Sequence, residues 1–168
     1  MMNLETDFRE AMARFAGVVT LITTGRGDAC RGLTATAVCS LSSAPPSVLV
    51  CVNGTASAHD AILVEGCFGV NLLSPDQAIL AERFSGRDGH QGAARFAGSR
   101  WIELATGAPI LAEAPVALDC RVSERFDGFS HSIIVGRVEA VQLLDGAAAE
   151  CLLWHRRAFR RTVDLATP

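Results

Sequence analysis

Apolar and polar side chains alternate along part of the chain with the two-residue period of a β-strand. From Val116 to Ser123, the residues Val, Leu, Cys and Val alternate with Ala, Asp, Arg and Ser. This period predicts a strand with one face toward solvent. A second apolar segment, 132–141, follows the turn-forming pair Asp127-Gly128. The two segments are therefore predicted to form a β-hairpin.

Further apolar runs rich in β-branched residues occupy the first half of the chain. Residues 18–23 and 32–39 flank the turn sequence Gly-Arg-Gly-Asp at 25–28, and this arrangement predicts another hairpin. Segments 47–52 and 67–73 are also apolar and follow Pro-Pro and Gly, respectively. Both are predicted to be strands.

Two short helices are predicted before residue 67. Asp7 and Glu10 resemble a capping box at the start of the amphipathic segment 7–16. Ser57 is the expected N-cap of the next helix, and Gly66 is placed to end it.

A third helix is expected to run from about Ser74 to Phe84. Ser74 is its predicted N-cap, with Pro75 at the first helical position and Gln77 two residues later. Residues 85–100 contain four glycines and no periodicity. They are predicted to form a long loop, and loops of this length are commonly functional or mobile.

The predicted elements indicate a mainly β fold with short helices, either an antiparallel sheet or a barrel. The chain has 168 residues, of which 49% are hydrophobic and 20% charged. This composition excludes intrinsic disorder and allows a substantial core. No repeat or linker divides the sequence, so residues 1–168 are expected to form a single domain.

The charged residues restrict the classes of function. All 15 basic residues are arginines, and the net charge is −3. The chain is therefore not expected to bind nucleic acid or an anionic membrane. The absence of lysine and tyrosine excludes Schiff-base, P-loop-lysine and phenolic acid chemistry. Any fixed cation that contacts a substrate must be a guanidinium or a metal.

The six cysteines are scattered and form no CxxC pair, which argues against a zinc knuckle or a redox dithiol. The first ten residues include three acids and do not resemble a signal peptide, and no apolar run could span a bilayer. We therefore expect a cytoplasmic protein with free thiols.

Three familiar site patterns are incomplete. Gly25-x-Gly27 follows a predicted strand but lacks the third glycine of a dinucleotide-binding loop, so a hairpin turn is the better interpretation. The segment 128–132 ends in serine, where the G-x-S-x-G motif of a serine hydrolase requires glycine. No two of the four histidines have the i, i+4 spacing of a helical metal site, and no metal is expected.

Two segments together could form a ligand site. Residues 32–40 are mostly small or hydroxylated, so a flat ligand could approach their backbone closely. Residues 51–60 supply the Ser57 hydroxyl and helix amides suited to phosphate. The same features also fit tight strand packing and an ordinary helix cap.

A series of motifs extends along most of the chain. They are Gly32–Ser42 (GLTATAVCSLS), Pro45-Pro46, Val50–Asn53 (VCVN), Ser57-x-His59-Asp60, Phe68-x-Val-Asn-Leu-Leu, Phe84–Arg87 (FSGR), Arg95-Phe96, Trp101 and His131 before a strand. In order and approximate spacing, the series resembles the short-chain flavin reductase family. This family supplies the reductase components of two-component flavin-dependent monooxygenases.

The resemblance implies a split β-barrel of the FMN-binding type, forming a homodimer that holds FMN or FAD near the subunit interface. It implies a reductase that transfers hydride from NADH or NADPH to the flavin and supplies reduced flavin to a partner oxygenase. The positions that match the family's flavin contacts are Thr34, Ala35, Thr36, Ala37, Ser40, Cys51, Val52, Asn53, Ser57, Phe84, Ser85 and Gly86.

The resemblance also places His131 near the nicotinamide. The family's common Gly-Asp-His-Thr reads Phe129-Ser130-His131-Ser132 here, so the acid before the histidine is missing. His131 could instead be an ordinary strand histidine. Two alternative functions remain open: a flavin-binding or electron-relay protein with the same barrel, and an interaction module without a ligand.

Overall fold

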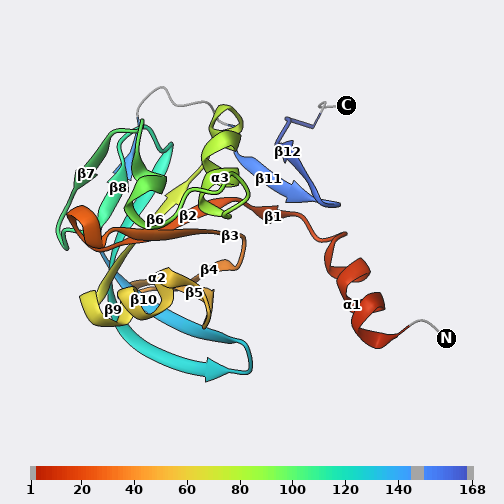
Figure 1. Ribbon diagram of the computed structural model, residues 1–168, viewed down its shortest axis with the longest axis horizontal. Coiled ribbons are helices and arrows are strands. Elements are labelled where there is room, and N and C mark those ends of the chain that lie inside the picture. The colour runs from red at the N-terminus through yellow and green to blue at the C-terminus, as the bar shows by residue number, and fades with distance from the viewer. Residues whose placement is uncertain (1–2, 145–149, 166–168) are drawn as a thin grey trace.

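The computed structural model describes residues 3–144 and 150–165 (Figure 1). Its strands are β1 (Gly17–Val18), β2 (Thr20–Thr24), β3 (Arg31–Ala35), β4 (Val38–Ser43), β5 (Pro46–Asn53), β6 (Cys67–Leu72), β7 (Trp101–Glu103), β8 (Pro109–Leu111), β9 (Val116–Gly128), β10 (His131–Leu143), β11 (Leu152–His155) and β12 (Ala158–Arg161). Its α-helices are α1 (Leu4–Met12), α2 (Ser57–Glu65) and α3 (Ala78–Phe84). The 3-10 turns are η1 (Gly27–Ala29), η2 (Pro75–Gln77) and η3 (Gly92–Phe96). The predicted mainly β fold with short helices is confirmed.

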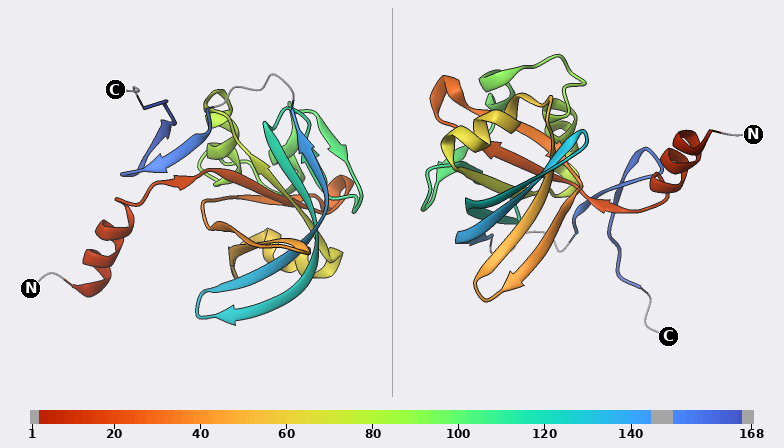
Figure 2. Two further views of the ribbon diagram at one scale, coloured as in Figure 1. Left: turned by 180° about the vertical axis from the view of Figure 1, so that it is seen from behind. Right: turned by 90° about the horizontal axis from the view of Figure 1, so that it is seen from below.

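Seven strands form one antiparallel sheet in the order β3-β2-β6-β9-β10-β5-β4. Its two edge strands, β3 and β4, follow each other in the chain and are joined by only Thr36 and Ala37. The sheet therefore curls until its edges are close, as the two views in Figure 2 show. Because β3 and β4 are not paired with each other, the barrel stays split along this line.

Burial of both faces explains the continuous apolar runs in the first half of the chain. Every residue of β2 is buried. Leu21 belongs to a core that includes Ala81 and Phe84 of α3, and Ile22 belongs to a second core that includes Ile62 of α2. A strand covered on both sides needs apolar side chains at successive positions.

The predicted hairpin of the second half is formed by β9 and β10, which are long and curved (Figure 1). Gly128 pairs with His131, so the turn is Phe129-Ser130. The prediction of one solvent face is wrong for the first part of β9, because Ala117 and Asp119 are fully buried. The Asp119 carboxylate is satisfied by the backbone N–H of Thr106 at 2.7 Å and by the Thr106 hydroxyl.

The second predicted hairpin is confirmed, since β2 pairs with β3, but the predicted strand 32–39 is wrong as one element, because it breaks at Thr36-Ala37 and continues as β4 on the opposite edge. Gly25 has a φ of 82° in the connection, where an added Cβ would lie 2.3 Å from the Ala29 carbonyl oxygen. A turn thus replaces the dinucleotide-binding loop, and glycine is required there.

The helices differ from the predictions mainly at their N-termini. The first spans residues 4–12 rather than 7–16, and the Asn3 side chain accepts the Glu5 N–H at its start. The N-cap of α2 is Ala56, so Ser57 is the first helical residue rather than the cap. Gly66 ends α2 in the left-handed conformation, as predicted.

The predicted capping box of the third helix is present, but it opens a 3-10 turn. The Ser74 N–H donates to the Gln77 side chain at 3.0 Å, and the 3-10 turn continues into α3. The predicted long loop after α3 contains η3. Phe96 and Trp101 hold this loop against the core by packing on Phe84, with ring centroids 5.0 and 5.8 Å from it.

A smaller sheet of β1, β11 and β12 lies beside the barrel, and α1 projects away from the barrel next to it (Figures 1 and 2). Arg157, at the turn between β11 and β12, donates to Glu10 of α1 at 2.6 Å. No α1 residue is buried. Within residues 3–144 and 150–165, no helix is long and apolar enough to cross a membrane.

Gly136 of β10 provides a test of the barrel packing. A Cβ at this position would lie 2.4 Å from Phe68 Cζ and 2.9 Å from Cys120 Cβ, both in the core. We expect Gly136→Ala to lower the free energy of unfolding by about 1–3 kcal/mol through overpacking, measured by urea denaturation. Gly128→Ala is the control, because its Cβ would meet only the His131 carbonyl oxygen at 3.7 Å. Equal stability of the two variants would contradict the packing argument.

Candidate functional site

A cavity of about 190 Å³ opens where the barrel is split. Thr34, Ala35 and Thr36 form one side of it, at the end of β3. The remaining lining residues are Val19, Ala81, Ser85, Arg87, Trp154 and Phe159. We call this space the edge cavity. Its lining combines exposed backbone with an aromatic wall from β11 and β12, which suits a planar ring system.

A second, polar cavity of about 530 Å³ is lined by Arg31, Ser57, Gly86, Gly89, His90, Gln91, Gly92 and Arg95. We call it the arginine cavity. The Arg95 guanidinium donates to the carbonyl oxygens of Gly32 and Phe84 at 2.9 and 3.0 Å, which fixes its position. An added Cβ at Gly86 would lie 3.0 Å from Arg95 Nη2, so the chain passes close to the cation.

The arginine cavity is suited to an anion. Arg31 donates to two backbone carbonyl oxygens, those of Asp28 and Cys30. In the described part of the chain, no carboxylate forms an ion pair with Arg31 or Arg95. Ser57 lies at the N-terminus of α2, where backbone N–H groups are free to donate. Two guanidinium groups, a hydroxyl and a helix N-terminus together can hold a phosphate.

The two cavities are neighbours at the C-terminal end of α3. Ser85 lines the edge cavity and Gly86, the next residue, lines the arginine cavity. A ligand with a flat ring and a phosphate-bearing tail could therefore occupy both cavities. Six residues from the sequence analysis line one cavity or the other: Thr34, Ala35, Thr36, Ser57, Ser85 and Gly86.

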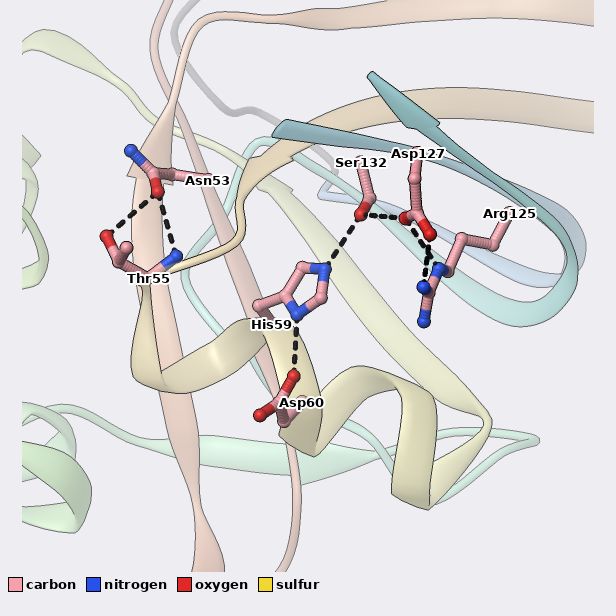
Figure 3. Close-up of polar contacts among 7 residues, drawn as sticks. All are labelled: Asn53, Thr55, His59, Asp60, Arg125, Asp127 and Ser132. Atoms are coloured by element: carbon pink, nitrogen blue, oxygen red, sulfur yellow. Dashed lines mark hydrogen bonds and ion pairs between the residues drawn. The ribbon is translucent and has the colours of Figure 1, made fainter. Parts of the chain in front are cut away.

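The other residues named from the sequence surround these cavities without lining them. Ala37 accepts the Cys51 N–H at 3.0 Å, and Ser40 pairs with Val48 on the barrel edge. The side chains of Val52 and Phe84 are buried in the two cores, so only their backbone atoms could contact a ligand. Asn53 accepts the backbone N–H and the hydroxyl of Thr55, both at 2.9 Å (Figure 3).

His131 is exposed and pairs with Asn53 of β5. Its Nδ1 lies 2.9 Å from the Ser130 hydroxyl. Ser130 thus provides a hydrogen-bonding partner at the position where the resembled motif has an acid.

A hydrogen-bond network with two buried members, His59 and Ser132, links α2 to the β9–β10 hairpin (Figure 3). His59 is 8% exposed; its Nε2 lies 2.8 Å from the Ser132 hydroxyl and its Nδ1 lies 2.7 Å from Asp60 Oδ1. The Ser132 hydroxyl donates to Asp127 Oδ1 at 2.7 Å. The Arg125 guanidinium pairs with the same carboxylate.

The Asp127 carboxylate fixes the direction of the hydrogen bond between Ser132 and Asp127. Hydrogen bonds from Arg125 and then Ser132 lower the pKa of Asp127 to about 2, so this carboxylate is ionised and can only accept. With the single Ser132 hydroxyl proton directed at Asp127, the Ser132 oxygen is left to accept an N–H from His59 Nε2. In this arrangement the Ser132 proton does not point at His59, as it would in the Ser-His pair of a hydrolase triad.

The sequence analysis missed several lining residues. Arg87 and Arg95 stand in the motif series but were not predicted to be site residues, and Arg31 carries no motif. Trp154 and Phe159 come from the end of the chain and reach the edge cavity only through the smaller sheet. The Arg87 guanidinium lies 5.0 Å from the centre of the Trp154 ring.

No group of three or more His, Cys, Asp or Glu side chains that could hold a metal ion occurs within the described ranges. The six cysteines are free thiols. Burial raises the pKa of the Cys120 thiol to about 12, with a further contribution from the neighbouring Asp119. This thiol is an inert part of the core.

Comparison with known proteins identifies the family. Residues 12–162 match the flavin reductase like domain. A protein named FMN reductase (NADH) RutF 2 from Methylorubrum extorquens is 44% identical over 153 residues, which cover 91% of this chain and 87% of that protein.

Solved structures agree in fold. The flavin reductase component of a bacterial two-component tryptophan halogenase, BorF, superposes with a TM-score of 0.85 at 33% identity, covering 96% of this chain and 99% of that one. The NADH:FAD oxidoreductase SgcE6 of Streptomyces globisporus, in complex with NAD and FAD fragments, also gives 0.85, at 28% identity and with coverage of 98% and 96%. The predicted split barrel is confirmed. The chain belongs to the flavin reductase like family.

Proposed function

We propose that this chain oxidises NADH and transfers the hydride to FMN. The observation that supports this most strongly is the pair of adjoining cavities, one flat and partly aromatic, the other lined by two arginines. The relative from Methylorubrum extorquens is named as an FMN reductase that uses NADH. A flavin-binding or electron-relay protein without catalysis is less favoured, because the compared proteins are named as reductases or oxidoreductases.

The arginine cavity is the proposed phosphate subsite. Ser57 would donate its hydroxyl to a phosphate oxygen, and Arg31 and Arg95 would balance the charge. Gly86 leaves room for close approach, since an added Cβ would already crowd Arg95. The donor set fits a phosphate monoester and needs no lysine.

The edge cavity is the proposed subsite for the isoalloxazine ring. Thr34, Ala35 and Thr36 would face the ring with backbone groups and small side chains. The other positions of this proposed flavin site are Ala37, Ser40, Cys51, Val52, Asn53, Phe84 and Ser85. When bound, FMN supplies the hydride-accepting chemistry, and the protein's contribution is to hold two substrates at reacting distance.

We place His131 on the nicotinamide side of the flavin. It lies at the start of β10 beside Asn53, the last residue of the proposed flavin-contacting strand β5. Ser130, through its contact with His131 Nδ1, would orient the ring. Hydride transfer needs no proton from His131, so its role is to position the nicotinamide.

We also propose that the chain forms a homodimer. The edge cavity, at about 190 Å³, is smaller than the roughly 300–1,000 Å³ typical of ligand pockets, so a second copy is expected to complete its wall. The helix α1 offers an uncovered apolar stripe of Leu4, Phe8 and Met12, and the exposed Phe15 follows shortly after the helix. Asp7 Oδ1, on the same helix, is inaccessible and has no hydrogen-bond partner within the described residues.

A flavin-dependent oxygenase is the proposed recipient of the reduced flavin, since BorF is the reductase component of a two-component system. We further propose that residues 1–168 act as one domain in the cytoplasm. The six free thiols are compatible with a reducing compartment.

Ser57→Ala tests the phosphate subsite. We expect the Kd for FMN to rise by about one to two decades, because a hydrogen bond to a charged group is lost. The Kd for riboflavin, which has no phosphate, should stay within about twofold of the original value. Fluorescence titration measures both constants. Ser43→Ala, which removes an exposed hydroxyl outside both cavities, is the control. Equal losses for FMN and riboflavin would restrict Ser57 to a structural role.

His131→Ala tests the nicotinamide side. We expect a higher KM for NADH and a moderate fall in the rate of flavin reduction, with the Kd for FMN nearly unchanged, because only nicotinamide positioning is impaired. Stopped-flow reduction of the FMN-loaded variant gives the rate, and steady-state oxidation at 340 nm gives KM. Wild-type values for both would remove His131 from the site.

Phe8→Glu tests the dimer. A charge in the apolar stripe of α1 should shift the mass from dimer to monomer at micromolar concentration, measured by light scattering. Thr6→Glu adds the same charge on the opposite side of the helix and should leave the dimer intact. The proposal is wrong if the unmodified chain is a monomer under these conditions.

A further inference from the structure

The first turn of α2 connects two parts of the proposed site. Ser57, its first residue, faces the arginine cavity, and His59, two residues later, is buried against the hairpin. On the hairpin, His131 is exposed and the next residue, Ser132, is only 4% exposed and bonded to His59. The hydrogen bond between His59 and Ser132 therefore links the helical turn that carries Ser57 to the residue that follows His131.

The hairpin needs such an anchor. Every residue from 123 to 131 is exposed, and Ser132 is the first buried side chain after this stretch. The ladder to β5, with the Gly54 N–H donating to the Ser130 carbonyl oxygen at 3.0 Å, fixes the hairpin along one edge. The contact between His59 and Ser132 fixes it on the face that meets α2 (Figure 3).

The contact belongs to a chain of hydrogen bonds. His59 Nε2 donates to Ser132, and Ser132 donates to Asp127, which also accepts from Arg125. On the other side of the ring, Nδ1 faces the Asp60 carboxylate, whose side chain is 89% exposed. Asp60 thus fixes the ring without itself being desolvated. A hydrogen bond between buried side chains of two elements, here His59 and Ser132, restricts those elements to one arrangement.

We propose that His59 is a positioning residue for hydride transfer, which holds the hairpin tip with His131 in register with the flavin site through Ser132. The proposal rests on the proposed roles of His131 and of the arginine cavity. His59 itself contacts neither substrate. Its removal should let the hairpin shift relative to α2 and misplace the nicotinamide, while the phosphate subsite on α2 keeps its own ligands.

Two substitutions separate the hydrogen bond from the space that His59 fills. His59→Leu fills the space of the histidine with an apolar side chain of comparable length, which cannot donate to Ser132. We expect the KM for NADH to rise and the rate of flavin reduction to fall, with the Kd for FMN within about twofold of wild type. His59→Gln retains an N–H donor and should recover most of the loss. The combined effect of two substitutions in one network departs from the product of the single effects by roughly 2-fold to 150-fold. A change of this size in KM is measurable.

Loss of stability alone is controlled by Ile62→Ala, which removes a fully buried side chain from the same helix without touching the network. This variant should lower Tm and leave the KM for NADH unchanged. Ser132→Ala breaks the contact from the hairpin side and replaces His59→Leu if that variant does not fold. The proposal is overturned if the folded His59 or Ser132 variants lower Tm but keep the wild-type KM and rate.

A double-mutant cycle with His131→Ala distinguishes this proposal from the proposed function. If His59 acts through His131, the combined variant should show a KM for NADH close to that of His131→Ala alone, not the product of the two single effects. An effect of His131→Ala with none of His59→Leu rejects the positioning role only. Wild-type behaviour of both single variants rejects the proposed role of His131 as well. Multiplicative effects would show that His59 acts independently of His131.

Discussion

The unpaired line between β3 and β4 is the constraint on which the site depends. A closed barrel would pair these edges and use their outward N–H and C=O groups in a ladder. Here the chain crosses from one edge to the other in two residues, Thr36 and Ala37, and both are exposed. The edge groups therefore remain available to a ligand, and the edge cavity lies beside them. Gly17 allows β1 to pass close to Thr36, since a Cβ added at position 17 would lie 2.8 Å from Thr36 Cβ.

A split barrel must keep its shape without the last ladder, and the buried polar residues supply this rigidity. Asn71 donates to the Leu21 carbonyl oxygen and to Thr23, and it accepts the Leu111 N–H at 2.7 Å. It is fully buried and ties β2, β6 and β8 together. The Thr34 hydroxyl donates to the Ala81 carbonyl oxygen at 2.6 Å and fixes α3 against the open edge. The ends of α3 and β3, which border both cavities, are therefore held in place from the core.

Local patterns predicted the longer strands, the two hairpins and six of the residues that line the cavities, but not the contacts between distant segments. The hairpins were predictable because alternation and turn residues lie close together in the sequence. The burial of Asp119 was not, since it depends on Thr106, thirteen residues away. The motifs containing Thr34 and Ser57 marked the cavities because each is a continuous segment. Trp154 and Phe159 carry no local signal, and their place in the edge cavity depends on how the smaller sheet packs beside the barrel.

The distribution of arginines explains how a chain with a net charge of −3 can still offer a strong anion site. Seven arginines of the described residues, including Arg83, Arg125 and Arg157, are paired with carboxylates at the surface and contribute little net field. Arg31 and Arg95 instead donate to backbone carbonyl oxygens, which orient the guanidinium groups without neutralising them. Their charge thus remains available to the arginine cavity. The backbone that orients Arg95 belongs to β3 and α3, whose ends border the open edge, and the backbone that orients Arg31 directly precedes β3.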